Sequence, residues 1–444
     1  MNLVQLTPGA GAMYCGGCLR DNALVAALRG LGHQVTMVPL YLPLTLDEDD
    51  QSAGTPVFFG GLNVYLEQKS TLFRAAPGWL HDFLSSPRLL KWAAGKAAKT
   101  RAADLGELTL SMLRGEVGNQ ARELENLVAW LRTLPRPDVI CLSNALLVGM
   151  ARRLKADLRV PVACALQGED FFLDTLPKPH RAACWQTLAE RATEVDLFIA
   201  PSRYFADLMQ ERLGLAAERV RVVHNGIKLE GYAGEGRGAR GEKKGGAVVG
   251  FFARMCPEKG LDTLVEAYIR LRQRGRATKS RLRVGGSCGP TDEAFVNSLR
   301  ERLRETGLLD EVEFHPNPDR AGKLKLLHSL SVFSVPARYG EAFGLYMLEA
   351  LAAGVPVVQP RTAAFPELVE ATGGGVLCAP DDPQALAEAI EELLLDPARA
   401  RELGEAGRRE VEKTFSAEVM ARAMEEVLRQ VAASRPARLV GNQS

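Results

Sequence analysis

The chain alternates short apolar segments with longer helical ones, and this alternation constrains its fold more than any other feature. In the first half, residues 3–6 have the pattern of a buried strand and residues 19–31 have helical spacing. Gly32 closes that helix before a second strand at 35–40. Further strands are predicted at 138–142, 160–166, 197–200 and 220–223. Strands that alternate with helices in this way predict a parallel sheet covered on both faces.

The same alternation restarts after a segment that is almost free of apolar residues. Residues 233–246 are mostly Gly, Arg, Glu and Lys, which is the composition of a flexible, solvated connector. Beyond this segment, strands are predicted at 247–252, 282–284, 312–314, 332–335, 355–358 and 376–378. The sequence thus predicts two doubly wound, Rossmann-like α/β domains, residues 1–232 and 247–415, whose strands end toward a shared central cleft. We further assign a helical insertion at 66–134 and a last amphipathic helix at 416–435.

The composition narrows the classes of protein that fit. With 46% hydrophobic and 25% charged residues, the chain has the balance of a folded globular protein. Its 55 basic and 54 acidic side chains give a formal net charge of +1, so no global field attracts it to nucleic acid. The N-terminus lacks the features of a signal peptide, no apolar run approaches the roughly 20 residues of a spanning helix, and the cysteines are scattered. We therefore expect a soluble, cytoplasmic protein with reduced thiols that binds no nucleic acid.

The first candidate site follows the predicted strand that ends at Phe252. Arg254 and Lys259 lie in a short loop before a helix that begins near Leu261. The groups of this loop suit the binding of a diphosphate, because Arg binds oxygens bidentately, Lys adds a compact charge, and the helix N-terminus adds backbone N–H groups. No metal ion is required for that binding. The alternative interpretation is that both side chains are ordinary charges of a solvated loop.

The second candidate site is the segment 336–350, which follows a strand that ends at Val335. A helix is predicted to begin near Gly344, where the missing side chain lets an anion approach the backbone N–H groups. Glu341 and Glu349 bracket that position, and their carboxylates suit the hydroxyls of a ribose and of a sugar. Alternatively, Glu341 only favours the helix N-terminus electrostatically and Glu349 is a surface charge.

With these segments, the chain resembles glycosyltransferase family 4, the glycosyl transferases group 1, which are retaining enzymes of the GT-B fold. The resemblance spans most of the chain, and the order and spacing of its motifs are more specific than any single motif. The motifs are Gly16-Gly17, Gly32-His33-Gln34-Val35, Pro201-Ser202, Val223-His224-Asn225-Gly226, Arg254, Lys259-Gly260, 341–349, Ala353-Gly354-Val355-Pro356-Val357-Val358, Pro366-Glu367 and Gly375-Val376.

The resemblance implies a function and a set of roles. It implies transfer of a hexosyl or related group from a nucleotide-sugar donor to a sugar, lipid-linked or small-molecule acceptor, with no metal ion or other cofactor. Arg254 and Lys259 would hold the diphosphate and Glu349 the ribose. The donor sugar and its phosphate would contact Glu341 and the backbone of Phe343, Gly344 and Leu345, and Gly17 would face the diphosphate from the first domain. The last helix would cross back onto the first domain.

The expected mechanism is mainly electrostatic. Negative charge builds on the departing diphosphate as the bond to the sugar breaks, so fixed positive groups on the leaving side favour that state. Retention in this family is usually pictured as attack of the acceptor on the front face, with the leaving phosphate helping to take its proton. We therefore assign catalysis to Arg254, Lys259 and Glu341 and assign no protein nucleophile.

One position departs from the family pattern. Family members commonly carry a His after a strand of the first domain, whereas this chain has Gln167, which cannot donate or take a proton as His can. We expect Gln167 to contact the donor sugar. The nearby Glu169 and Asp170 either meet the acceptor or cap the helix that follows.

Two other functions compete with sugar transfer. The segment 285–289 matches G-x-S-x-G after a strand, so Ser287 with His315 or His328 would suit an α/β-hydrolase. That interpretation leaves Arg254 and Lys259 unexplained. A sugar-nucleotide-binding protein without activity would share every phosphate contact.

Four remaining patterns are given mostly structural interpretations. The run that opens at Gly9 lacks the third Gly of a dinucleotide fingerprint, and the acidic run 47–50 suits a solvated loop better than a metal site. Cys15 and Cys18 are expected to be free thiols in a tight turn. Residues 69–101 are basic with interleaved aromatic residues, which fits either a solvated helical face or peripheral contact with an anionic membrane.

Overall fold

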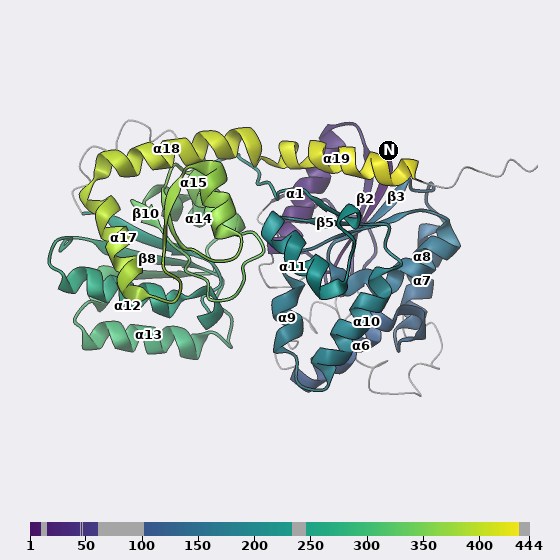
Figure 1. The fold of residues 1–444 in the computed structure, drawn as a ribbon, viewed down its shortest axis with the longest axis horizontal. Coiled ribbons are helices and arrows are strands. Elements are labelled where there is room, and N and C mark those ends of the chain that lie inside the picture. Colours follow the sequence, from purple (N-terminus) through teal and green to yellow (C-terminus); the bar gives the residue numbers. More distant parts are fainter. Residues whose placement is uncertain (10–15, 45, 47, 61–101, 233–245, 435–444) are drawn as a thin grey trace, which may run out of the picture. The chain divides into compact units, whose positions relative to one another are not determined.

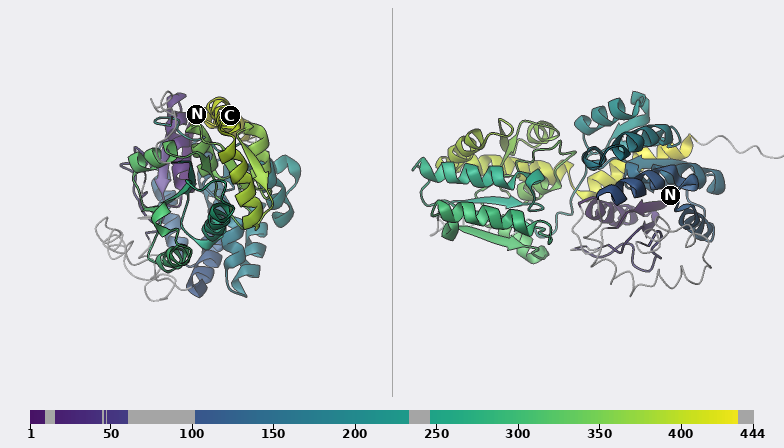
Figure 2. Two further views of the ribbon diagram at one scale, coloured as in Figure 1. Left: turned by 90° about the vertical axis from the view of Figure 1, so that its left-hand side faces the viewer. Right: turned by 90° about the horizontal axis from the view of Figure 1, so that it is seen from below.

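The computed structural model describes residues 1–9, 16–44, 46, 48–60, 102–232 and 246–434. Within these residues the chain forms two compact units, each built on its own six-stranded parallel sheet. The first unit is Met1–Pro201, Ala206–Val223 and Ala421–Ser444, and the second is Ser202–Phe205 and His224–Met420. In each unit, helices lie on both sides of the sheet (Figures 1 and 2), as expected for doubly wound folds.

The sheet of the first unit has the strand order β2-β1-β3-β4-β5-β6. Its strands are β1 (Asn2–Thr7), β2 (Gln34–Pro39), β3 (Val139–Leu142), β4 (Val162–Ala165), β5 (Leu197–Ala200) and β6 (Val220–Val222). The described helices are α1 (Gly16–Gly30), α6 (Ala102–Arg114), α7 (Ala121–Leu131), α8 (Ala151–Leu158), α9 (Glu169–Thr175), α10 (His180–Ala192) and α11 (Arg203–Leu213). Every residue of β3, β4 and β5 is buried, which explains their continuous apolar sequences. All six strands predicted in this half are confirmed.

The second sheet has the order β12-β11-β10-β7-β8-β9. Its strands are β7 (Val248–Phe252), β8 (Arg281–Gly286), β9 (Val312–Pro316), β10 (Val332–Phe333), β11 (Val357–Pro360) and β12 (Gly375–Cys378). The helices are α12 (Leu261–Gln273), α13 (Glu293–Glu305), α14 (Arg320–His328), α15 (Leu345–Ala352), α16 (Phe365–Thr372), α17 (Pro383–Leu395) and α18 (Pro397–Thr414). The six strands predicted for this half are confirmed as well. β7 pairs with β8 on one side and with β10 on the other, so the carboxyl ends of these three strands share one edge.

The division between the units falls at Val223 and His224, ahead of the segment 233–246 that the sequence assigns to the connector. Local contacts explain this position. Ile227 forms a parallel bridge with Ser416, and the Tyr232 hydroxyl donates to Glu349 Oε1 at 2.9 Å. Residues 224–232 therefore pack as part of the second unit. Residues 233–245 of the connector and residues 66–101 of the predicted insertion lie outside the described residues.

The last helix, α19 (Ala417–Ala433), belongs to the first unit from Ala421 onward. There Arg20 of α1 donates to the Met424 sulfur at 3.9 Å, and Met424 and Leu428 are buried. Arg20 also pairs with Asp21 at 2.9 Å, and Asp21 accepts a hydrogen bond from Thr7 at the end of β1. This buried polar group fixes α1 and the C-terminal helix against the first sheet.

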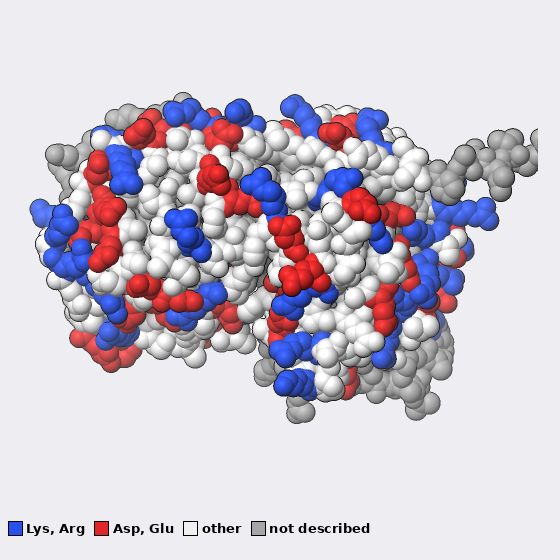
Figure 3. Space-filling view, in the orientation of Figure 1, with Lys and Arg blue, Asp and Glu red and all other residues white. Residues whose placement is uncertain are grey.

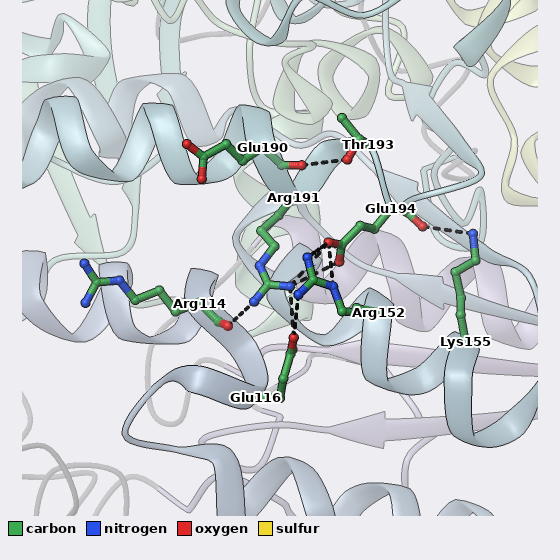
Figure 4. A network of polar contacts seen from close by, with 8 residues as sticks. All are labelled: Arg114, Glu116, Arg152, Lys155, Glu190, Arg191, Thr193 and Glu194. Carbon is green, nitrogen blue, oxygen red and sulfur yellow. Dashed lines mark hydrogen bonds and ion pairs between the residues drawn. The ribbon is translucent and has the colours of Figure 1, made fainter.

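A network of charged side chains joins the helices on one side of the first unit (Figure 4). Arg191 of α10 has a side chain that is only 7% exposed and contacts both Glu116 and Glu194 at 3.2 Å. It also donates to the backbone carbonyl of Arg114, and Arg152 of α8 contacts the same two carboxylates from the exposed side. Because each of these charges is paired within the network, we interpret the network as structural.

The surface charges are mixed, and the described helices include none that could span a membrane. On the face drawn in Figure 3, basic and acidic side chains are interspersed. No helix among the described residues is long and apolar enough to cross a membrane.

Candidate functional site

The residues predicted from the two loops of the second half gather at one edge of the second sheet. Arg254 and Lys259 follow β7, and Glu341 and Gly344 follow its neighbour β10. The two loops interlock: the backbone N–H of Arg338 donates to the Glu258 carbonyl at 3.0 Å. Strand pairing and loop contacts together therefore bring both candidate segments into one site.

Gly260 makes this interlocking possible. Its φ of +69° lies in the left-handed region, and a Cβ placed on it would lie 1.9 Å from the carbonyl oxygen of Pro336. Only a glycine allows the two loops to approach so closely without displacing the backbone. Gly260 also precedes α12 directly, so the position of the Lys259 side chain depends on this turn.

Lys259 and Glu341 form an ion pair in which Nζ lies 2.6 Å from Oε2. The same Nζ contacts the Tyr339 hydroxyl, and the Tyr346 hydroxyl donates to Glu341 Oε2 at 2.8 Å. Both charged side chains are mostly buried. The sequence pointed to Lys259 and Glu341 separately, but the two tyrosines were not singled out, although they lie within the same segment as Glu341.

The neighbours within this cluster and its burial shift the pKa values of its side chains. Burial by itself would lower the pKa of Lys259, but the carboxylate of Glu341 and the hydroxyl of Tyr339 outweigh burial and raise the pKa above its ordinary value. Burial and the neighbouring Glu341 raise the pKa of Tyr346 well above its usual range. At neutral pH Lys259 therefore keeps its ammonium group and Tyr346 keeps its phenolic proton, and both donate hydrogen bonds to Glu341 Oε2.

Arg254 is held by a residue that the sequence analysis did not single out, Asp292. The guanidinium Nη2 lies 2.9 Å from Asp292 Oδ1, and Nε lies 3.1 Å from Oδ2. This ion pair raises the pKa of Arg254, first through its hydrogen bond to Asp292. An acidic residue at the start of the helix that follows the neighbouring strand β8 is the sequence signal that was available.

The helix α15 begins at the predicted place, with Gly344 as the residue before its first turn. Gly344 has a φ of +94°, and a Cβ there would come within 3.3 Å of Phe365. Phe343 is buried, and Leu345 starts the helix. Because the first turn of a helix leaves N–H groups without intrahelical partners, the backbone here suits an anion.

Glu349, in the second turn of α15, is mostly buried and paired. Its Oε1 accepts hydrogen bonds from the Tyr232 hydroxyl at 2.9 Å and from Lys323 Nζ at 3.0 Å. The Lys323 side chain is only 3% exposed. The alternative interpretation of Glu349 as a solvated surface charge is therefore wrong.

The other predicted site residues lie in the first unit. Gly17 is in the first turn of α1, and Gln167 follows β4. The backbone N–H of Gln167 donates to Glu169 Oε2 at 2.9 Å, and that of Ala145 donates to Oε1 at 2.7 Å. Glu169 thus ties the loops after β3 and β4 together, and backbone N–H groups in the first turn of α9 also interact with the carboxylates of Glu169 and Asp170, as the capping alternative expected. Burial raises the pKa of Glu169 to about 7 and also raises the pKa of Asp170.

The histidines proposed for a hydrolase do not contact Ser287 in the described structure. His315 lies 3.2 Å from Glu313, and the ring of His328 contacts the Tyr232 carbonyl at 2.9 Å. After Ser287 the chain continues in a loop, and α13 starts only at Glu293, so the sharp turn of a nucleophile elbow is missing.

Several patterns named in the sequence analysis lie wholly or partly outside the described residues. These are Cys15, Asp47, the residues after Gly9 in the glycine-rich run, and the basic stretch 69–101. Cys18, the described partner in the C-x-x-C pattern, is buried in α1.

Comparisons with known proteins agree with this architecture. The model of "Glycosyl transferases group 1" matches residues 235–410, and that of "Glycosyltransferase Family 4" matches residues 106–230. The chain belongs to glycosyltransferase family 4. The family expected from the sequence is thus confirmed, and the two match regions cover the candidate loops of the second unit and most of the first sheet.

Curated relatives match only part of this family 4 protein. It is 31% identical over 234 residues to glycogen synthase from Mycobacterium tuberculosis H37Rv, and the match covers 53% of the chain and 54% of that protein. It is 36% identical over 184 residues to the lipopolysaccharide core biosynthesis mannosyltransferase LpsB of Rhizobium meliloti, covering 40% and 49%. The chain thus matches about half the length of these two relatives.

Solved structures extend the likeness over nearly the whole chain. Sucrose-phosphate synthase from Thermosynechococcus elongatus has a TM-score of 0.71 and 22% identity, and the match covers 97% of this chain and 99% of that one. Anabaena HepE, solved in complex with UDP and glucose, has a TM-score of 0.70 and 17% identity, with the same coverage. These likenesses confirm the predicted two-domain GT-B fold.

The interlocked loops give a stability prediction with an internal control. Gly260→Ala should lower the free energy of unfolding by more than about 2 kcal/mol, because the new Cβ would collide with the Pro336 carbonyl. Gly275→Ala should cost only about 1 kcal/mol, since Gly275 has a similar φ of +75° but open space around it. Urea unfolding followed by circular dichroism measures both, and equal losses would show that the loops do not interlock as described.

Glu169 gives a prediction about pH. Its folded pKa of about 7 lies above that of a free glutamate, so the folded state binds this proton more tightly than the unfolded chain does. The resulting stabilisation is complete below the unfolded pKa and is lost as the pH rises through 7. Glu169→Gln removes this titration, so its melting temperature should fall less than that of the wild type from about pH 5 to about pH 8. Identical pH profiles would contradict a raised pKa at Glu169.

Proposed function

We propose that the protein is a retaining glycosyltransferase that moves a sugar from a nucleotide-sugar donor to an acceptor hydroxyl without a metal ion. The observation that carries the proposal is the meeting of the loop after β7 with the loop after β10. It places Arg254, Lys259 and the start of α15 at one edge of the second sheet. In open parallel sheets this edge is where ligands bind.

The proposed roles follow from the charges at that edge. Arg254 and Lys259 bind the diphosphate together with the backbone N–H groups at Gly344 and Leu345, beside the buried ring of Phe343. As the bond between sugar and phosphate breaks, these groups stabilise the negative charge that builds on the leaving diphosphate. Two side-chain cations supply the charge that a metal ion provides in other transferases.

Glu341 is proposed to bind the donor sugar through hydrogen bonds. Its Oε2 already accepts from Lys259 and Tyr346, which stabilises the charged carboxylate and makes it a weak nucleophile. The described residues leave Oε1 to accept from sugar hydroxyls. This arrangement supports attack by the acceptor itself, and attack on the same face that the diphosphate leaves gives retention without a covalent enzyme intermediate.

Glu349 is proposed to bind the ribose. Lys323 and Tyr232 both donate to Oε1, which fixes the orientation of the carboxylate, and Oε2 is the oxygen proposed to accept from the ribose hydroxyls. The names of two relatives are compatible with such a donor: HepE was solved with UDP-glucose, and LpsB is called a mannosyltransferase. The acceptor is proposed to be a sugar, a lipid-linked sugar or a small molecule, and the roles of Gly17 and Gln167 stay predictions.

A nucleotide-binding experiment tests the proposal. UDP, GDP and ADP are titrated against the wild type in the presence of EDTA, and at least one should raise the melting temperature, by an amount equivalent to about 2.7 kcal/mol at a hundredfold excess over Kd. Arg254→Ala and Lys259→Ala should each weaken that nucleotide by tenfold or more, because each removes a charge-assisted contact worth about 1.5–3 kcal/mol. Arg270→Ala, at an exposed position near the other end of α12, serves as the control.

The same variants separate an enzyme from an inactive binding protein. With the matching nucleotide sugar, the wild type should release the nucleoside diphosphate in the presence of an acceptor, and loss of Arg254 should lower that rate by about 10² to 10³. Normal nucleotide affinity in both Arg254→Ala and Lys259→Ala would overturn the proposed site. Tight binding without any turnover across donors and acceptors would favour the inactive protein.

A further inference from the structure

The guanidinium of Arg254 is held along one edge. Nε and Nη2 both contact the carboxylate of Asp292, with distances from 2.9 to 3.2 Å. A guanidinium is planar and carries five N–H donors in a fixed fork, so a carboxylate on the Nε and Nη2 edge leaves the Nη1 donors directed away from it. The Arg254 side chain is 54% exposed, whereas that of Asp292 is 7% exposed. The free edge of the arginine is thus the accessible one.

Asp292 is itself rigidly placed. Asp292 directly precedes α13, and its Oδ2 accepts the backbone N–H of Gly289 at 3.0 Å. The loop before it is tied to the end of β9, because Asn317 exchanges two hydrogen bonds of 2.9 Å with the backbone of Cys288. The same loop is tied to the Arg254 loop, since the Met255 N–H donates to the Ser287 carbonyl at 2.8 Å. Loops from three neighbouring strands therefore fix the carboxylate relative to Arg254.

We propose that Asp292 is the positioning residue of the diphosphate site: it holds Arg254 in one orientation so that the Nη1 edge is presented to the phosphate oxygens. The proposal rests on the proposed function. A long side chain that is fixed before binding favours tighter binding, because immobilising a rotamer-rich side chain on binding costs about 0.5–1.5 kcal/mol. Asp292 touches neither nucleotide nor sugar and acts only through Arg254.

The competing hypothesis is that Asp292 weakens nucleotide binding, and the test distinguishes the two. A carboxylate near a bound diphosphate also repels it, so Asp292 would weaken binding if it competed with the phosphate for the same donors. In the described geometry the carboxylate occupies a different edge from Nη1, and orientation outweighs repulsion. Removing Asp292 therefore weakens binding under this proposal and strengthens it under competition.

The experiment is a double-mutant cycle on nucleotide binding. Isothermal titration in EDTA uses whichever of UDP, GDP and ADP binds the wild type most tightly. Asp292→Ala should weaken binding about tenfold in the wild-type background and have no further effect in Arg254→Ala, because residues that act through one contact are not additive. Asp292→Asn keeps an oxygen for the Gly289 N–H but cannot hold both Nε and Nη2, so it should bind as weakly as Asp292→Ala while unfolding like the wild type.

Asp319→Ala is the matched control, because Asp319 caps α14 of the same unit and accepts the Gly322 N–H at 2.8 Å. It should leave nucleotide affinity unchanged. Unchanged or tighter binding in Asp292→Ala, wild-type affinity in Asp292→Asn, or an equal loss from Asp292→Ala in the Arg254→Ala background would each overturn the positioning role. If the wild type binds none of the three nucleotides, the proposed function falls and this inference falls with it. If the wild type binds and only Arg254→Ala weakens binding, this inference alone is wrong.

Discussion

The candidate site depends on the parallel pairing of β7 with β10 and β8, which brings the ends of three strands to one edge of the second sheet. Parallel strands that are buried on both faces leave only their end loops to carry polar chemistry. Gly260 then allows two of these loops to interlock, at the Pro336 carbonyl. Arg254, Lys259 and Glu341 are thus positioned by backbone geometry more than by their own side-chain preferences.

Each cation of the site is already paired before a ligand binds. Lys259 contacts Glu341, Arg254 contacts Asp292, and the buried Lys323 contacts Glu349. A mostly buried charge without a partner would be costly, so these pairs keep the site stable and its donors ordered. The ligand consequently meets groups that are fixed in place, which is the condition under which electrostatic stabilisation of a leaving diphosphate is effective.

Much of this arrangement could be predicted from the sequence, and the limit is physical. The local signals are the apolar strand segments, Gly344 at a helix start and the cations after Phe252. The apolar segments predicted twelve strands, and the described structure has all of them. The pairs were not predictable, because Asp292 is 38 residues from Arg254 and Lys323 is 26 residues from Glu349. Similarly, the sequence around Glu169 offered capping of the next helix or contact with the acceptor, and it gave no sign that the carboxylate also binds the backbone of Ala145, on the loop after the neighbouring strand. Contacts between loops depend on strand order, which a single sequence does not reveal.

The central claim is that the two interlocked loops form a diphosphate site that needs no metal ion. A crystal structure of the wild-type protein with its tightest nucleoside diphosphate, grown in EDTA, tests this claim most directly. The account predicts diphosphate oxygens within hydrogen-bond distance of Arg254 Nη1, of Lys259 Nζ and of the backbone at the start of α15, with Asp292 still bound to the other edge of Arg254. A diphosphate bound elsewhere on the protein, or one that appears only when a divalent cation bridges it to carboxylates, would contradict the account.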